Sequence, residues 1–186
     1  IGEMPILWHV MKIYSHYGYK DFVLSLGYKG EMIKDYFLNF DERANNLTLK
    51  LGAGTKEIVY HNKKKFVDDW QITFVDTGLN TNTGGRVAKI KDFIGNDENF
   101  FLTYGDGVAD IKIPEVLKYH IVKGKVATLC GVNYINPFGV IEPEDGLVKH
   151  FQEKPQSRAF INGGFYVLNR KIFDYLKPDD GLVFEK

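Results

Sequence analysis

The sequence predicts an α/β protein, with a mostly parallel sheet flanked by helices and small β-hairpin additions. Strand-like and helix-like segments alternate at spacings of about 10 to 15 residues, which is typical of parallel strands joined by crossover helices. The chain has 186 residues, and 44% of them are hydrophobic, which suits one sizeable core. No internal repeat or low-complexity linker divides it, so we expect a single domain over residues 1–186.

The first half of the chain alternates between helical and strand patterns. Residues 5–18 place apolar side chains at helical spacing, with Pro5 near the start and Gly18 as the stop. The elements expected next are a strand at 22–26, a helix at 31–40, an edge hairpin of strands at 47–51 and 57–61, a solvated turn at 62–65, a strand at 71–78 and a helix at 84–95.

The second half continues in the same way. Its expected elements are a strand at 99–106, a helix at 113–124, a strand at 125–132, a hairpin of 138–143 and 147–155, a strand at 163–169 and a last helix at 170–176. In open parallel sheets, ligands bind beyond the carboxyl ends of the strands. Asp106 follows the run "FFLTY" and Asp76 follows "QITFV", so we expect both at the same rim.

Composition and charge exclude several classes of protein. Lysine plus arginine equals aspartate plus glutamate, 24 each, so no global field favours nucleic acid or a membrane surface as a partner. No apolar run reaches the ~18 residues of a membrane span. The single cysteine, Cys130, excludes an internal disulfide and fits a reducing compartment, so we expect a cytoplasmic protein.

Residues 76–86, "DTGLNTNTGGR", have the composition of a nucleotide-binding loop. Gly84 and Gly85 stand just before a helix, where bare backbone can approach a flat ring or a phosphate and the helix N-terminus favours anions. Thr83 adds a hydroxyl, and Arg86 adds a planar, permanently charged fork. The alternative is a plain polar loop that starts a helix. The segment is neither a P-loop nor a dinucleotide fingerprint.

The stretch "YGDG" ends an apolar strand with a carboxylate between Gly105 and Gly107. Mg²⁺ takes one or two protein carboxylates and completes its shell with phosphate oxygens and water. The small neighbours would let a triphosphate approach Asp106. These residues therefore indicate a magnesium site, with a simple turn as the alternative.

Two further segments indicate a sugar-phosphate site. In "FQEKP", Lys154 precedes Pro155 and is expected to be extended, which would aim its charge at a phosphate; the alternative is a surface ion pair with Glu153. In "INGGFYVLN", Asn162 can donate and accept toward a sugar hydroxyl, and Gly163 allows close approach; the alternative is a tight turn.

Other kinds of site find little support. The five histidines are scattered without a pair at metal-ligand spacing, so structural roles are expected for them. No serine or cysteine stands in a nucleophile-elbow context, which argues against covalent hydrolase chemistry.

Taken together and in this order, "PILWH" with "IYSHYG", "DTG" with "TGGR", "FFLTYGDGVAD", "FQEKP" and "INGGFYVL" resemble the sugar-1-phosphate nucleotidylyltransferases. The likeness covers nearly the whole chain. It is closest to the branch that transfers a cytidylyl group from CTP to glucose-1-phosphate. It implies a Rossmann-like nucleotidyltransferase sheet, Mg²⁺ as cofactor, and a homo-oligomer. The balanced charge argues separately against nucleic acid and membrane as partners.

The resemblance also implies residue roles. Asp106, with Gly105 beside it, is similar to the strand-end aspartate that holds Mg²⁺ on the nucleotide phosphates. Thr83, Gly84, Gly85 and Arg86 match the family's loop beside the pyrimidine and ribose. Lys154 matches the lysine that binds the sugar phosphate. Glu153, Asn162 and Gly163 match positions that contact the sugar hydroxyls.

The family begins with a strand, a "G-x-G-T-R" loop and a "K-P-K-P" segment, and places a second metal-binding aspartate late in the chain. None of these is in the sequence, which opens without methionine, so we expect the domain to be incomplete at both ends. Three alternatives stay open: a transferase that uses dTTP, UTP or GTP, a glycosyltransferase, and a non-catalytic domain that binds nucleotide sugars.

Overall fold

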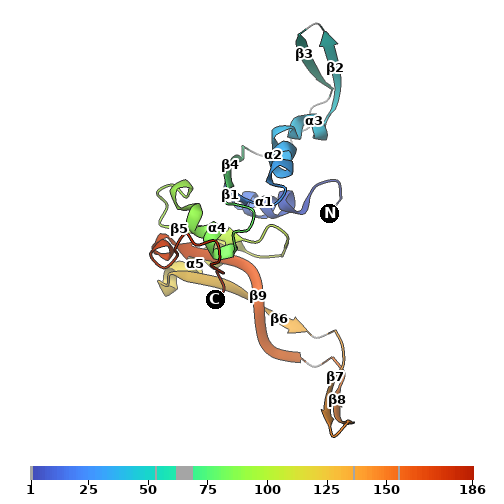
Figure 1. Cartoon of the computed structure of the whole chain (residues 1–186), viewed down its shortest axis with the longest axis vertical. Coiled ribbons are helices and arrows are strands. Elements are labelled where there is room, and N and C mark those ends of the chain that lie inside the picture. Colours follow the sequence, from blue (N-terminus) through green and yellow to red (C-terminus); the bar gives the residue numbers. More distant parts are fainter. Residues whose placement is uncertain (1, 53, 62–68, 136, 155) are drawn as a thin grey trace. The chain divides into compact units, whose positions relative to one another are not determined.

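The computed structural model describes all residues except 1, 53, 62–68, 136 and 155, and divides the chain into two compact units (Figure 1). Unit 1 comprises Ile1–Asp97 and Lys171–Lys186, and unit 2 comprises Glu98–Arg170. The expectation of one domain over 1–186 therefore stays a prediction, and the turn expected at 62–65 lies outside the described residues.

Unit 1 contains a parallel strand pair, a hairpin and most of the helices. Its elements are α1 (Ile6–His16), β1 (Asp21–Leu26), α2 (Gly30–Leu38), α3 (Phe40–Ala44), β2 (Asn46–Gly52), β3 (Thr55–His61), β4 (Gln71–Asp76), α4 (Thr83–Lys89) and the 3₁₀ helix η1 (Lys91–Phe93). β1 and β4 pair in parallel, from Asp21 opposite Gln71 to Leu26 opposite Asp76. β2 and β3 form the expected hairpin. The carboxyl ends of β1 and β4 therefore share one rim.

The core of unit 1 forms around α1. Val10, Met11 and Tyr14 are buried, as their spacing on a helix predicts. The indole Nε1 of Trp70, directly before β4, donates to Ser15 Oγ on α1 at 2.8 Å. The helix is thus fixed to the sheet by apolar packing and by one specific hydrogen bond.

Unit 2 contains a three-stranded sheet, one helix and a hairpin. Its elements are β5 (Asn99–Thr103), α5 (Ile113–Lys123), β6 (Ala127–Ile135), β7 (Val140–Glu144), β8 (Leu147–Gln152) and β9 (Gln156–Asn169). The strand order is β5-β9-β6, and β7 pairs with β8 in the expected hairpin. Both neighbours of β9 run antiparallel to it, so β5 and β6 run in the same direction.

The α/β class and the hairpin additions are confirmed, but the expected predominance of parallel pairing is not what the described strands show. Of their five pairings, β1–β4 is parallel and four are antiparallel. The reason is β9, which comes late in the chain and inserts between β5 and β6. The alternation β5-α5-β6 suggested a parallel neighbour pair, and local pattern cannot reveal a later strand between them.

Three of the predicted helices differ from those in the structure. The segment expected at 31–40 is broken into α2 and α3, and the one expected at 84–95 changes from α4 into η1. The last one forms a 3₁₀ helix, η2 (Arg170–Asp174), in place of a regular α-helix. Over a few residues, the same spacing of apolar side chains fits an α-helix and a 3₁₀ helix, so the sequence pattern does not distinguish the two. Within the described residues, no helix has the length and apolar character needed to cross a membrane.

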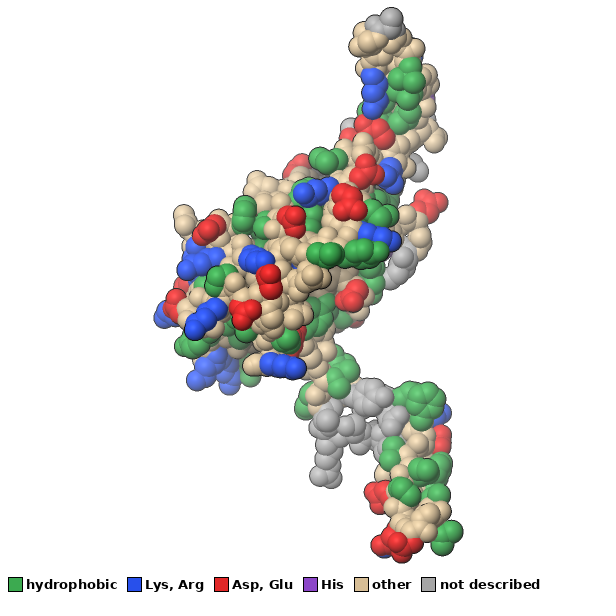
Figure 2. All heavy atoms as spheres, in the orientation of Figure 1, with side chains coloured by type: hydrophobic (Ala, Val, Ile, Leu, Met, Phe, Trp, Pro, Cys, Tyr) green, Lys and Arg blue, Asp and Glu red, His purple; other side chains and the backbone are tan. Residues whose placement is uncertain are grey.

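The hairpin of β7 and β8 is exposed along its whole length. Figure 2 shows apolar side chains on its surface. Those with the largest exposed fractions include Leu147 (75%), Val148 (59%) and Phe151 (59%). These side chains lie outside the core of unit 2, which is built on β9.

The core of unit 2 is the buried run of β9, residues 165–168. His120 on α5 is also buried, with 2% of its surface exposed. Its Nδ1 lies 2.8 Å from Thr128 Oγ1 on β6, and its Nε2 lies 3.1 Å from Asn99 Oδ1 on β5. This histidine therefore has a structural role, as predicted, and ties the helix to both outer strands.

We predict that His120 makes unit 2 sensitive to acid. Burial lowers the pKa of His120 below its ordinary value of 6.5, so the folded protein binds a proton less readily than the unfolded chain. The free energy of unfolding then has its full value above about pH 6.5. It decreases as the pH drops below that value, by at most about 1.4 kcal/mol per pH unit. In melting curves between pH 7 and 5 (about two pH units), His120→Gln should lose less stability on acidification than the wild type. His150→Gln, exposed on β8, is the control. Equal acid sensitivity of His120→Gln and wild type would contradict the prediction.

Candidate functional site

The carboxyl ends of β1 and β4 are joined by Thr77, which follows β4 and is 1% exposed. Its N–H and its Oγ1 both donate to the carbonyl oxygen of Leu26, at 2.9 and 2.8 Å. The carboxylate of Asp76 accepts a hydrogen bond from the N–H of Gly78 at 3.0 Å, which closes a tight turn. The loop therefore leaves the rim in a fixed direction.

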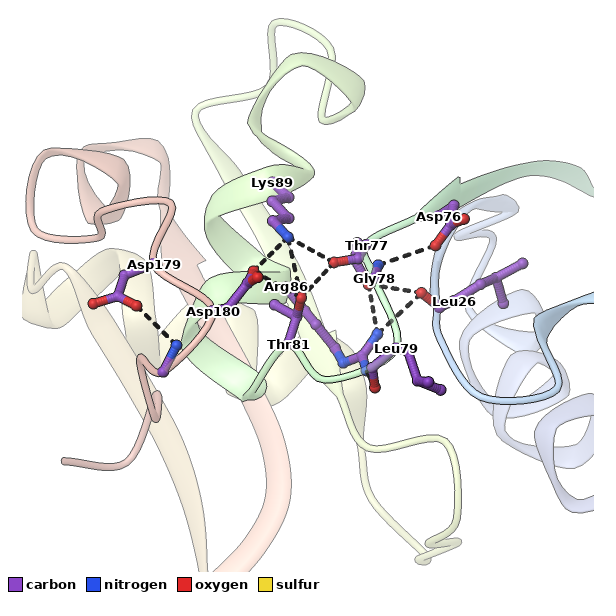
Figure 3. A network of polar contacts seen from close by, with 11 residues as sticks. Leu26, Asp76, Thr77, Gly78, Leu79, Thr81, Arg86, Lys89, Asp179 and Asp180 are labelled. Atoms are coloured by element: carbon purple, nitrogen blue, oxygen red, sulfur yellow. Dashed lines mark hydrogen bonds and ion pairs between the residues drawn. The ribbon is translucent and has the colours of Figure 1, made fainter.

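Arg86 on α4 reaches back to this rim (Figure 3). Its Nη1 donates to the Leu26 carbonyl at 3.0 Å and lies 2.6 Å from Thr77 Oγ1, and its Nη2 lies 3.5 Å from the Leu79 carbonyl. A Cβ added at Gly27 would come within 2.5 Å of Arg86 Nη2, so the guanidinium also occupies the space beside that glycine. The fork of Arg86 is thus engaged with the protein, where the sequence predicted a contact with nucleotide.

A second cation in the same network was missed by the sequence analysis. Lys89 Nζ donates to the Thr77 carbonyl at 2.8 Å, to Thr81 Oγ1 at 3.0 Å and to Asp180 Oδ1 at 2.6 Å. The hydrogen bond from Lys89, then that from Thr81, lowers the pKa of the Asp180 carboxyl. Lys89 lies three residues after Arg86, one helical turn along, which is the signal that could have linked the two.

Gly84 and Gly85 are buried against the C-terminal segment Asp179–Leu182. Their N–H groups donate to the Leu182 carbonyl at 2.9 and 3.2 Å. A Cβ on Gly84 would lie 2.7 Å from Leu182 Cγ, and one on Gly85 would lie 2.4 Å from the Asp179 carbonyl oxygen. Close packing within unit 1 therefore explains both glycines.

Thr83, the first residue of α4, is also engaged by the C-terminal segment. Its Oγ1 accepts from the N–H of Phe184 at 2.9 Å and donates to Glu185 Oε2 at 2.9 Å. All four predicted nucleotide-binding residues of this loop thus lie together at one end of α4. Their predicted contacts with a nucleotide stay predictions.

Asp106 and its neighbours lie in unit 2, on the turn that follows β5. Asp106 and Gly105 are exposed. A Cβ built on Gly107 would meet no atom within 4 Å, and Gly107 does not have a positive φ. Neither close packing nor a positive φ therefore explains why position 107 is a glycine. Space beside Asp106 is what the predicted ligand would need.

Asn162 on β9 lies close to the same end of β5. Its Nδ2 donates to the hydroxyl oxygens of Tyr104 (3.1 Å) and Tyr166, and its Oδ1 accepts from the N–H of Gly164 at 2.9 Å. A Cβ on Gly163 would lie 2.9 Å from the Cys130 carbonyl oxygen, so packing explains that glycine. Because Tyr104 is two residues from Asp106, the structure brings Asn162 near the predicted metal ligand.

Glu153 and Lys154 follow β8 and are both exposed. The backbone of Lys154 has φ 43°, in the left-handed region, so the predicted extended conformation is wrong. The preference of a residue before proline is a tendency that a turn after a hairpin strand can override. A Cβ on Gly139 would lie 3.0 Å from Glu153 Oε2, which places this carboxylate against the start of β7. Among the described residues, Glu153 and Lys154 do not form an ion pair.

No cluster of three or more His, Cys, Asp or Glu side chains that could hold a metal occurs in the described part of the chain. Asp106 offers a single exposed carboxylate. That donor set suits a metal which takes most of its ligands from a phosphate and water, as Mg²⁺ does. It does not suit a metal held by protein ligands alone.

Comparison with known proteins defines the class. The nucleotidyl transferase family model matches residues 1–182, and the chain belongs to this family. Its fold is similar to that of HddC from Yersinia pseudotuberculosis, with a TM-score of 0.67 at 21% identity over 100% of this chain and 71% of that one. It is also similar to a UDP-glucose pyrophosphorylase complexed with UDP-glucose, with a TM-score of 0.57 at 18% identity over 98% and 72% of the two chains.

Two curated relatives are more similar in sequence. The chain is 48% identical over 185 residues to the "Probable glucose-1-phosphate cytidylyltransferase" of Bacillus subtilis, covering 100% of this chain and 70% of that protein. It is 43% identical over 180 residues to the glucose-1-phosphate cytidylyltransferase of Salmonella typhi, covering 96% and 68%. The resemblance stated from the motifs is therefore confirmed.

We predict that Gly85→Ala destabilises the protein. Alanine favours a helix over glycine by about 1 kcal/mol, but its methyl group would overlap the Asp179 carbonyl. Such overpacking costs ~1 to 3 kcal/mol, so the overlap wins and the melting temperature should fall. Gly107→Ala is the matched control, since it adds the same methyl group in open space and should melt like the wild type. Similar melting temperatures for Gly85→Ala and the control would contradict the packing explanation.

Proposed function

We propose that this nucleotidyl transferase transfers a cytidylyl group from CTP to glucose-1-phosphate, giving CDP-glucose and pyrophosphate. The observation that carries the proposal is the 43% to 48% identity, over 96% to 100% of this chain, to relatives named as glucose-1-phosphate cytidylyltransferases. The motifs "DTG", "TGGR" and "YGDG" support the same assignment.

In this reaction a phosphate oxygen of glucose-1-phosphate attacks the α-phosphorus of CTP. The bond from that phosphorus to the oxygen bridging the α- and β-phosphates breaks, and pyrophosphate leaves. The attacking oxygen is already anionic, so no general base is needed. The protein therefore contributes mainly by orienting two polyanions and offsetting their repulsion.

We assign the nucleotide phosphates to the turn of Gly105, Asp106 and Gly107. The exposed carboxylate of Asp106 would hold Mg²⁺, which supplies charge neutralisation on the phosphates when bound. The open space at Gly107 supports this assignment, because neither packing nor a positive φ explains the glycine.

We assign the sugar phosphate to residues of the same unit. Lys154 would contribute a positive charge to the phosphate, and Glu153, Asn162 and Gly163 would lie toward the sugar hydroxyls. The exposure of Glu153, Lys154 and Asn162 is compatible with contact to a ligand. The hydrogen bonds of Asn162 to the end of β5 support its place beside the Asp106 turn.

We assign the loop at the start of α4 to the pyrimidine and ribose. Thr83, Gly84, Gly85 and Arg86 are held by bonds and packing within unit 1, so in this proposal they act by fixing the loop that adjoins the base. Arg86 would fix this loop through its hydrogen bond to the end of β1. Gly84 and Gly85 would fix it through their packing against the C-terminal segment.

Two properties of the whole protein belong to the same proposal. The single cysteine fits a reducing compartment, and we place the enzyme in the cytoplasm. The family resemblance also implies a homo-oligomer. Gel filtration with light scattering would test the second statement.

The proposal predicts strong discrimination between nucleotides. A site that hydrogen-bonds one ring edge leaves buried polar groups unpaired when the wrong base binds, and this can reduce kcat/KM by roughly 10³-fold or more. With glucose-1-phosphate as acceptor, the purified enzyme should use CTP far better than UTP, dTTP or GTP. Comparable rates with CTP and dTTP would move it to the thymidylyl branch, and no transfer with any nucleotide would support a binding domain.

A second prediction concerns Asp106. If it holds Mg²⁺, Asp106→Asn should reduce turnover by at least ~10²-fold and weaken Mg²⁺-dependent CTP binding, while the melting temperature is unchanged because the side chain is exposed. Asp145→Asn is the control: this acid is exposed on the β7–β8 turn, and Asn tolerates its positive φ of 52°. Near wild-type activity of Asp106→Asn would return Asp106 to the turn role.

A further inference from the structure

Three side chains of unit 2 form a closed hydrogen-bonded triangle at the end of β5. The hydroxyl oxygens of Tyr104 and Tyr166 lie 3.0 Å apart, and the Nδ2 of Asn162 donates to both of them. Tyr166 is 4% exposed, Tyr104 is half-buried and Asn162 is exposed. The triangle therefore connects the core of the unit to its surface.

The orientation of the Asn162 amide is fixed by this arrangement. Its oxygen faces the N–H of Gly164 at 2.9 Å. A reversed amide would place NH₂ against that N–H, and donor against donor is unfavourable, so the opposite assignment is excluded by the partner on the backbone. The side chain thus has one allowed orientation in this setting.

The backbone that carries Asn162 is itself constrained. Leu129 on β6 lies opposite Tyr166, but Gly131 lies opposite Asn162, so β9 bulges between these two register positions. Gly164 in the bulge has φ 75°, and a Cβ there would lie 2.8 Å from Tyr104 Cδ2. The bulge brings Asn162 and Tyr166 to the same point although they are four residues apart.

The donors and acceptors of Asn162 can be counted. Both N–H donors of its amide are used by the two tyrosine hydroxyls, and one of the two lone pairs of Oδ1 is used by Gly164. What the exposed side chain can still offer to a ligand is one acceptor position. This differs from the sequence-based expectation that Asn162 both donates and accepts.

We propose that Tyr104 and Tyr166 are positioning residues that hold Asn162 as a hydrogen-bond acceptor for one hydroxyl group of the sugar phosphate. The inference rests on the proposed function, because that function assigns Asn162 to the sugar. It adds that Asn162 is the acceptor and the sugar the donor in this hydrogen bond, and it names the two tyrosines that orient Asn162. The substrate must then present a hydroxyl donor at that position.

The polarity is tested with modified sugars. Binding of glucose-1-phosphate to the purified enzyme is compared with that of its deoxy and deoxyfluoro analogues, one ring position at a time, by titration calorimetry. At one position the hydroxyl should bind about 3- to 10-fold more tightly than both analogues, because fluorine cannot donate. The gap should vanish in Asn162→Ala. If the deoxy analogue loses affinity at a position but the deoxyfluoro analogue binds like the hydroxyl, or if no position shows a loss, the acceptor assignment is overturned.

The positioning role is tested with a double-mutant cycle. Tyr166→Phe and Tyr104→Phe keep the rings and remove the hydroxyl partners of Asn162. Each should raise KM for glucose-1-phosphate about 3- to 10-fold and leave KM for CTP unchanged. In the Asn162→Ala background the same substitutions should have no further effect. Tyr119→Phe, exposed on α5 in the same unit, is the control and should match the wild type. Tyr104→Phe serves if buried Tyr166→Phe fails to fold.

The outcomes separate the two proposals. If Asn162→Ala has wild-type kinetics with glucose-1-phosphate, the sugar-site assignment of the proposed function is wrong. If Asn162→Ala is impaired but the tyrosine variants are neutral, or add their effect to it in full, the assignment stands and the positioning role is wrong. Full coupling supports both.

Discussion

The carbonyl oxygen of Leu26 accepts three hydrogen bonds, from the N–H and the Oγ1 of Thr77 and from Arg86. A parallel strand that ends at a sheet rim leaves polar groups of its backbone without a strand partner, and these must be satisfied elsewhere. Here the partners are Thr77, which directly follows the paired strand β4, and Arg86 of α4. The order of unit 1 around this rim depends on that one acceptor.

In unit 2, backbone polar groups without a strand partner are satisfied in a different way. In its central strand β9, residues 166–168 are paired with β5 on one side and with β6 on the other. Where β9 bulges, side chains replace the ladder, and Asn162, Tyr104 and Thr103 bond to the glycine backbone or to one another; Thr103 Oγ1 donates to the Gly164 carbonyl at 2.9 Å. Arg86 in unit 1 and Asn162 in unit 2 therefore both make hydrogen bonds where regular strand pairing stops.

The sequence was informative where the determinants are local. The apolar spacing of α1, with Pro5 near its start and Gly18 as its stop, predicted that helix, and the glycines around Asp106 marked the end of β5. It was less informative for contacts between distant segments. Lys89 and Asp180 are 91 residues apart, and Asn162 and Tyr104 are 58 apart, so no local pattern links them. The insertion of β9 between β5 and β6 is of the same kind. The sequence predicts a close approach to Gly84 and Gly85, and in the structure the approaching group is the C-terminal segment Asp179–Leu182.

The open space beside Gly107 has a practical consequence for spectroscopy. Cys130 is the one cysteine of the sequence, it is half-buried, and burial raises the pKa of its thiol, so it reacts slowly with labelling reagents. The Cβ of a cysteine introduced at position 107 would meet no atom within 4 Å apart from its chain neighbours, one of which is Asp106. A fluorophore or spin label attached there would sense the arrival of a charged ligand directly, so occupancy of the turn could be followed in real time without an enzymatic readout.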